Sequence, residues 1–196
     1  MTQGAAMISR TAAQAGLLLL TALVLPGCLL IRTTDHMITL KEDGSGDARM
    51  RLIDIRSDAQ SDSLVARDYA VMMASIEKEG IEEFERGGRK VTSKRFFASG
   101  DTLTAEITYT FPNLNEVEGL KFHRNEMWVV VNEGREIVKT NGDVQSWMKG
   151  SKRIVWPRDA KHLMYRISEK KLPPARSLVP LYLKYGYSLP PSPEAR

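Results

Sequence analysis

Residues 102–111 alternate strictly between apolar and polar side chains, and this pattern restricts the fold more than any other stretch. Side chains of a strand point alternately to opposite faces of its sheet. A strand with one packed and one solvated face is typical of an antiparallel sheet. The packed face is predicted to hold Leu103, Ala105, Ile107, Tyr109 and Phe111, and the solvated face Thr104, Glu106, Thr108 and Thr110.

Turn residues predict two hairpins, one built around this strand. Asp43-Gly44-Ser45-Gly46 separates two apolar-patterned runs, and Ser99-Gly100-Asp101 joins residues 90–98 to 101–111. Glycine after aspartate supplies the positive φ that a tight turn needs. Within 47–56 the apolar phase changes from Met50 and Leu52 to Ile53 and Ile55. That change predicts a bulge or a strand that is apolar on both faces.

One amphipathic helix is predicted between the hairpins, over residues 61–80. Its apolar stripe is Val65, Tyr69, Met72, Met73 and Ile76. Residues 61–63 offer N-caps, Gly80 is the predicted C-cap, and 82–90 is predicted to be an exposed loop. Two interpretations of the methionines stay open: core packing, or lining of a lipid pocket, which flexible methionine side chains suit.

The remaining pattern completes an α+β fold. A short helix begins at Asn113, and residues 126–132 and 135–139 are strands. Residues 154–156 and 163–167 are expected as short strands, with a helix over 159–168 as the alternative. Strands thus outnumber helices and pair in hairpins. We therefore predict a mostly antiparallel sheet with one main amphipathic helix.

A proline-rich extension follows, over residues 172–196. Six of the nine prolines lie here, together with leucines and tyrosines that are too apolar for a free tail. We expect 178–189 to run extended along a groove or a partner, and 190–196 to be disordered.

The apolar run near the N-terminus is too short to cross a membrane. It extends over residues 15–25, whereas a spanning helix needs about 20 residues. One basic residue, Arg10, and no acid precede it. This layout is typical of a secretory signal peptide.

Leu25-Pro26-Gly27-Cys28 resembles the lipobox of bacterial lipoproteins. The resemblance implies cleavage before Cys28, diacylation of its sulfur and export to the cell envelope, on the outer membrane of a Gram-negative host because Leu29 is not aspartate. Residues 1–27 would then be the signal peptide, 28–35 a lipidated tether and 36–171 the folded domain. A buried core cysteine, or an ordinary cleaved signal, is the alternative.

The hairpin sequence Lys41-Glu42-Asp43-Gly44-Ser45-Gly46 and the stretch from Tyr109 to Glu116, YTFPNLNE, carry a second resemblance. Together with the lipobox they resemble the LppM-like envelope lipoproteins, over roughly residues 28–135. The resemblance implies an α+β domain whose sheet and helix enclose an apolar cavity for envelope lipids. It implies no catalytic residue, cofactor or metal.

Charge is unevenly distributed in the exported part of the chain. After residue 27 there are 27 Lys and Arg against 24 Asp and Glu, but residues 149–171 hold eight basic and two acidic residues, with Trp147, Trp156 and Tyr165 interleaved. This stretch is a candidate contact for anionic lipid or glycolipid head groups; the alternative is a solvated face. The candidate residues are Lys149, Lys152, Arg153, Arg158, Lys161 and Arg166.

No motif for catalysis, metal or nucleic-acid binding is present in the sequence. His36, His123 and His162 lie in unrelated local patterns, and residues 42–47 lack the spaced carboxylates of a calcium loop. The favoured function is a non-enzymatic binding or assembly module anchored to a membrane. One alternative is an accessory protein that docks a partner through 172–196. The other is a hydrolase, which needs a polar cleft uniting His123 or His162 with a nucleophile.

Overall fold

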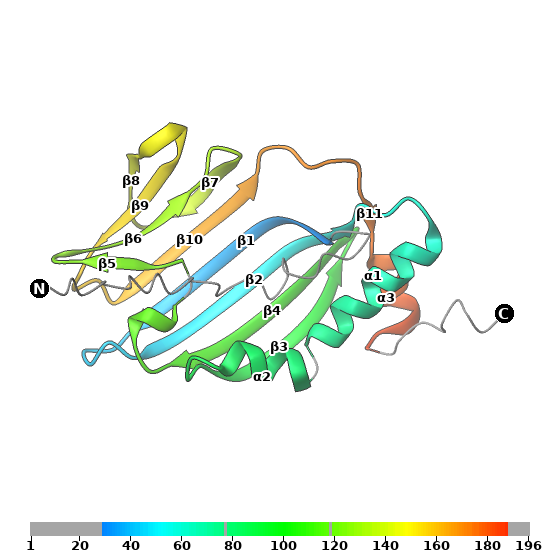
Figure 1. The fold of residues 1–196 in the computed structure, drawn as a ribbon, viewed down its shortest axis with the longest axis horizontal. Helices are drawn as coiled ribbons and strands as arrows, with labels where there is room; N and C mark the ends of the chain where they lie inside the picture. Colours follow the sequence, from blue (N-terminus) through cyan, green and yellow to red (C-terminus); the bar gives the residue numbers. More distant parts are fainter. Residues whose placement is uncertain (1–28, 77, 118, 188–196) are drawn as a thin grey trace, which may run out of the picture.

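The computed structural model describes residues 29–76, 78–117 and 119–187, and Figure 1 shows their arrangement. Within these residues the chain forms two antiparallel sheets. The large sheet has the order β3-β4-β2-β1-β10-β7, with β11 paired to β2, and the small sheet has the order β5-β6-β9-β8. The strands of the large sheet are β1 (Leu29–Leu40), β2 (Gly46–Ser57), β3 (Lys90–Ser99), β4 (Thr102–Phe111), β7 (Arg135–Thr140), β10 (His162–Glu169) and β11 (Arg176–Ser177). Those of the small sheet are β5 (Lys121–His123), β6 (Glu126–Val131), β8 (Asp143–Ser146) and β9 (Lys152–Pro157), and the helices are α1 (Asp62–Ser75), α2 (Lys78–Glu85), α3 (Val179–Tyr185) and the 3-10 turns η1 (Leu114–Glu116) and η2 (Met148–Gly150).

The predicted α+β class and its antiparallel pairing are confirmed. Both hairpins form at the predicted turns, with φ of 83° at Gly44 and 58° at Gly100. Asn113 caps η1 by accepting a hydrogen bond from the backbone N–H of Asn115. The strands predicted at 126–132, 135–139, 154–156 and 163–167 are β6, β7, β9 and β10, so the helical alternative for 159–168 is wrong.

The phase change in β2 occurs at Asp54, after Ile53 rather than before it, so Ile53 belongs to neither core cluster. Asp54 has a φ of 61°, and the buried side chains switch there from Leu52 to Ile55 and Ser57. Strand β1 changes phase opposite Asp54 as well. Ile31, paired with Ile55, and Ile38, paired with Ala48, both pack against the core although they are seven residues apart. The pairing register of the two strands is unchanged across this point.

The predicted helix is two helices. Ser61 caps α1 through a hydrogen bond from the N–H of Leu64, and the predicted stripe is buried from Val65 to Met73. However, α1 ends at Ser75, and Gly80 lies inside α2 rather than at a C-cap. A Cβ at Gly80 would lie 1.9 Å from the carbonyl oxygen of Ser75, so its glycine permits the close contact between the helices.

The exposed loop predicted at 82–90 is confirmed only for residues 86–89, which connect α2 to β3. Residues 82–85 belong to α2, which turns Phe84 into the core, where its ring packs edge-on against Tyr109 with centroids 5.0 Å apart. The charges of this segment lie on the outer face of a short amphipathic helix.

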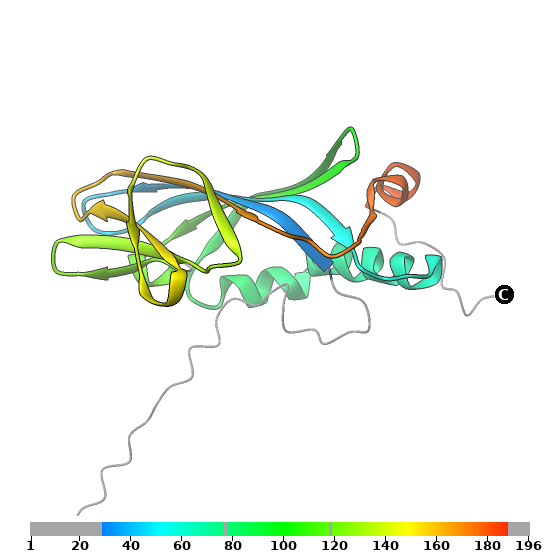
Figure 2. The same ribbon diagram turned by 90° about the horizontal axis from the view of Figure 1, so that it is seen from above.

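Helices α1 and α2 and the small sheet lie on one side of the large sheet, as Figure 2 shows. One core cluster joins the two sheets, through Tyr109, Leu163, Ile154 and Trp156 among others. A second packs α1 and α3 on the end of β2, β3 and β4. Among the described residues, no helix or second sheet covers the opposite side of the large sheet, which we call the open face.

The structure corrects both predicted ends of the domain. Residues 29–35, predicted as part of a lipidated tether, form the first half of β1 and pair with β2 and β10. The segment 178–187 is packed as predicted but is not extended: it forms α3, with Leu178 and Val179 buried. Pro180 is in the first turn of α3, where a proline favours a helix because its missing N–H is not needed. The predicted disorder at 190–196, like Cys28 and the signal peptide, lies outside the described residues.

Candidate functional site

A row of alternating charges crosses five strands on the open face. Cross-strand partners follow directly in the pairing register, so their side chains share one face. We call this row the charge ladder; from β3 to β10 it consists of Arg95, Glu106, Arg51, Asp35 and Arg166.

The ladder is held by charge-assisted hydrogen bonds. Glu106 accepts from Arg51 and, at 2.7 Å, from Nη2 of Arg95, while Nη2 of Arg166 donates to Asp35 at 2.6 Å. Both carboxylates are buried, whereas the side chain of Arg95 is 57% exposed. Burial alone would raise the pKa of Glu106, but the bonds and charges of the two arginines outweigh it and lower that pKa.

The arginines of this face outnumber their carboxylate partners. Arg49 lies two residues before Arg51 on β2 and therefore points to the same face. Its side chain donates to the sulfur of Met37, a weak acceptor that carries no charge. Four guanidinium groups thus face two carboxylates in two adjacent rows, an excess of two positive charges in these rows.

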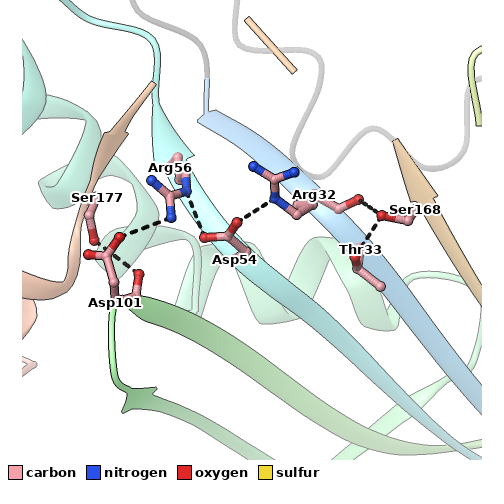
Figure 3. A network of polar contacts seen from close by, with 7 residues as sticks. All are labelled: Arg32, Thr33, Asp54, Arg56, Asp101, Ser168 and Ser177. Carbon is pink, nitrogen blue, oxygen red and sulfur yellow. Dashed lines mark hydrogen bonds and ion pairs between the residues drawn. The ribbon is translucent and has the colours of Figure 1, made fainter. Parts of the chain in front are cut away.

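A second arginine–carboxylate network lies on the same face, nearer the start of β1 (Figure 3). Asp54 accepts from Arg32 and Arg56, each at 2.7 Å. Arg56 also donates to Asp101 at 3.0 Å, and Ser177 of β11 donates to the main-chain oxygen of Asp101 at 3.3 Å. These bonds connect β1, β2, β11 and the β3–β4 turn around Asp54, the residue at which β2 changes phase.

The predicted basic residues do not form one patch. Lys149 and Lys152 are exposed at the β8–β9 end of the small sheet, and Arg158 and Lys161 lie in the β9–β10 turn at the other end of β9. Arg153 is held by Gln145, Glu126 and the ring of Trp147, 4.7 Å from its guanidinium carbon. Of the six, Arg166 alone belongs to the charge ladder.

The sequence contains some signals for the residues of the open face that were not among the predicted site residues. Arg49 and Arg51 alternate with apolar neighbours, and Glu106 lies on the predicted polar face of β4. Thr104 and Glu106 are buried, however, although that face was predicted to be solvated. The long arginine side chains of neighbouring strands account for the covering of Glu106.

The fold does not unite the histidines. His36 stacks on Tyr165 on the packed face, with ring centroids 4.5 Å apart, and burial lowers its pKa to about 4 against the opposing effect of Asp35. Nδ1 of His162 lies 3.3 Å from the hydroxyl of Thr39, on the open face, and His123 is in β5. Within the described residues, no three His, Cys, Asp or Glu side chains are placed to hold a metal.

The stripe of α1 packs in the core, as the first of its two interpretations predicted. Met72 and Met73 are each 1% exposed and pack with Leu103 and Phe96. A hollow of about 180 Å³ lies beside the end of α1, lined by Met73, Ile76, Lys94 and Tyr187. It is shallow and smaller than the 300–1,000 Å³ of most small-molecule sites.

Comparison with protein-family models, curated proteins and solved structures gives no match to this chain. The resemblances to lipoproteins and to LppM-like proteins therefore stay predictions from motifs. Among the described residues, no helix combines the length and apolarity needed to cross a membrane.

Proposed function

We propose that this protein is an exported envelope lipoprotein, anchored through Cys28, whose domain is a non-enzymatic module for an anionic amphiphile. The ligand class is a lipid or glycolipid with a phosphate or carboxylate head group. The observation that carries this proposal is the excess of arginine on the open face. A guanidinium group donates two parallel hydrogen bonds to either anion, and it stays charged at every physiological pH.

Arg49 and Arg95 are the two ladder-face arginines best placed for such a ligand. Arg49 has the neutral sulfur of Met37 as its partner, and Arg95 is more than half exposed. Glu106 keeps Arg51 when Arg95 is removed, so the ladder is not left with an unpaired buried charge.

The binding test uses residues 28–196 with Cys28→Ala, which contain every described element. The probe is dihexanoylphosphatidylglycerol below its micelle concentration, measured by calorimetry, with dihexanoylphosphatidylcholine as the neutral comparison. Arg49→Gln with Arg95→Gln should weaken binding at least about tenfold, because one charged hydrogen bond contributes about 1.5–3 kcal/mol. Lys149→Gln with Lys152→Gln removes the same charge from the small sheet and should leave binding unchanged. Equal affinity for both lipids, or a larger loss in the lysine pair, would contradict the proposal.

The anchor has a separate test. The full chain, expressed in a bacterium that lipidates exported proteins, should partition with membranes and take up labelled palmitate, and Cys28→Ala should do neither. Processing without palmitate uptake would favour an ordinary secretory signal.

The alternative function is docking on a protein partner through 172–196. Fewer apolar residues of this segment are free for a partner than the sequence indicates. Leu178 and Val179 are used in the core, and the hydroxyl of Tyr182 donates to Phe96 of β3 at 2.8 Å. Deleting the whole extension would therefore damage the fold. Leu183→Asp in the soluble chain is the discriminating variant, because that side chain is 74% exposed. Loss of a protein complex while the short-chain lipid still binds would favour the partner.

A further inference from the structure

The start of β1 and helix α3 lie at the same end of the large sheet. Leu29 pairs with Ser57 of β2 on one side, and Arg176 of β11 pairs with Ser57 on the other. Neighbouring strands are about 4.8 Å apart, so β11 passes about 10 Å from the first residue of β1. Figure 1 shows α3 following β11 at this end, with the small sheet at the opposite end.

Helix α3 presents an apolar side chain to solvent. Leu178, just before the helix, and Val179, its first residue, are buried, while Pro180, Leu183 and Lys184 are exposed at the spacing of one helix face. Leu183, at 74% exposed, is the most exposed large apolar side chain in the described part of the chain. A surface helix ordinarily places polar residues on this side.

The proposed anchor residue is bonded directly to the first residue of β1. Cys28 directly precedes Leu29, and consecutive Cα atoms are about 3.8 Å apart. Because Leu29 is already paired in the sheet, acyl chains on Cys28 would hold the end of the sheet itself at the membrane. This step rests on the proposed lipid anchor.

We propose that α3 lies on the bilayer that holds the anchor, as a second, non-covalent contact. Leu183 enters the boundary between head groups and acyl chains, and Lys184 lies among anionic head groups. The anchor then gains an orientation: the domain stands on the end that carries α3, with the small sheet farthest from the membrane.

The test places a fluorophore at this contact in the full lipidated chain. Leu183→Cys is labelled with an environment-sensitive dye and reconstituted in vesicles of phosphatidylcholine and phosphatidylglycerol. The chain has one cysteine, and its sulfur is consumed by lipidation, so the new thiol alone reacts. Val144→Cys on β8, 47% exposed, is the matched control in the small sheet. Quenching is measured with lipids that carry a nitroxide on the acyl chain.

We expect the label at 183 to lose most of its emission to these lipids, and the label at 144 to keep it. An unquenched label at 183 on chains that float with the vesicles overturns the inference but leaves the anchor intact. Equal quenching at both sites also overturns it, because the domain would then lie on its side. If the chain does not float, the lipid anchor fails and the inference fails with it.

Discussion

Glu106→Gln should destabilise the domain by about 2 kcal/mol, because it removes the charge that two arginines share. Breaking a buried ion pair costs about 3–5 kcal/mol, whereas an exposed pair contributes about 0–1 kcal/mol. Glu106 is 9% exposed, but its partners Arg51 and Arg95 are 29% and 57% exposed, which places the cost between these limits. Glutamine keeps the shape of the side chain, so packing changes little.

The measurement is urea unfolding followed by circular dichroism, with a thermal melt beside it. For a domain of this size about 1 kcal/mol corresponds to 2–4 °C, so the melting temperature should fall by about 4–8 °C. Asp101→Asn is the matched control, because Asp101 also binds an arginine, Arg56, but its side chain is 68% exposed. A loss for Glu106→Gln no larger than for this control would refute the buried character of the ladder.

The pH dependence gives a second check on the same variant. The pKa of Glu106 is lowered in the folded state, so its contribution is present above the unfolded value of about 4.3 and is lost as the pH falls through the folded value. The stability gap between the native chain and Glu106→Gln should therefore close on acidification below about pH 4. A gap that stays constant down to pH 3 would mean that the charge of Glu106 does not contribute.

Three further predictions follow from single contacts. The native chain should lose about 2 kcal/mol of stability between pH 7 and pH 5, because the pKa of His36 is about 6.5 in the unfolded chain but about 4 in the folded one. His36→Gln should remove most of this difference, measured as the shift in urea midpoint between the two pH values. Gly46→Ala should lower the free energy of unfolding by at least about 2 kcal/mol, since its Cβ would lie 2.1 Å from a carbonyl oxygen of β1. Gly134→Ala, with open space around it, should be within about 0.5 kcal/mol of the native chain, and equal melting temperatures for the two variants would contradict this. Tyr187→Phe should speed hydrogen exchange at the backbone N–H of Phe96, which donates to the tyrosine hydroxyl at 2.8 Å on the edge of β3, and unchanged exchange would show that this bond does not protect the edge.

Turns in the sequence were sufficient to predict part of the ladder. A hairpin centred at residues 100–101 pairs Arg95 with Glu106, and one centred at Asp43 pairs Asp35 with Arg51, as the structure shows. The hydrophobic pattern assigns the strands, and counting outward from each turn then gives these two pairs.

The other contacts depend on tertiary structure. Arg166 meets Asp35 across 131 residues, and no local pattern indicates that β10 lies beside β1. The end of α1 at Ser75 depends on the approach of α2 through Gly80, and the burial of Phe84 depends on Tyr109. The prolines of the extension indicated an extended chain, but a proline in a first helical turn favours the opposite result, as Pro180 shows.

The orientation proposed for the anchored chain restricts the ligand of the open face. Asp35 follows Leu29 by six residues, so the ladder lies about 20 Å along β1 from the anchored end. The interfacial layer of a bilayer is about 5–8 Å thick on each side. A phospholipid resting in the same leaflet therefore cannot place its phosphate on Arg49 or Arg95 while the domain stands on α3. An acidic glycolipid with an extended head group can, and so can a lipid already lifted from the bilayer. Phosphatidylglycerol in the same bilayer should thus leave the ladder of the anchored chain free to bind a soluble short-chain probe. Competition by the bilayer lipid would mean that the open face lies against the membrane.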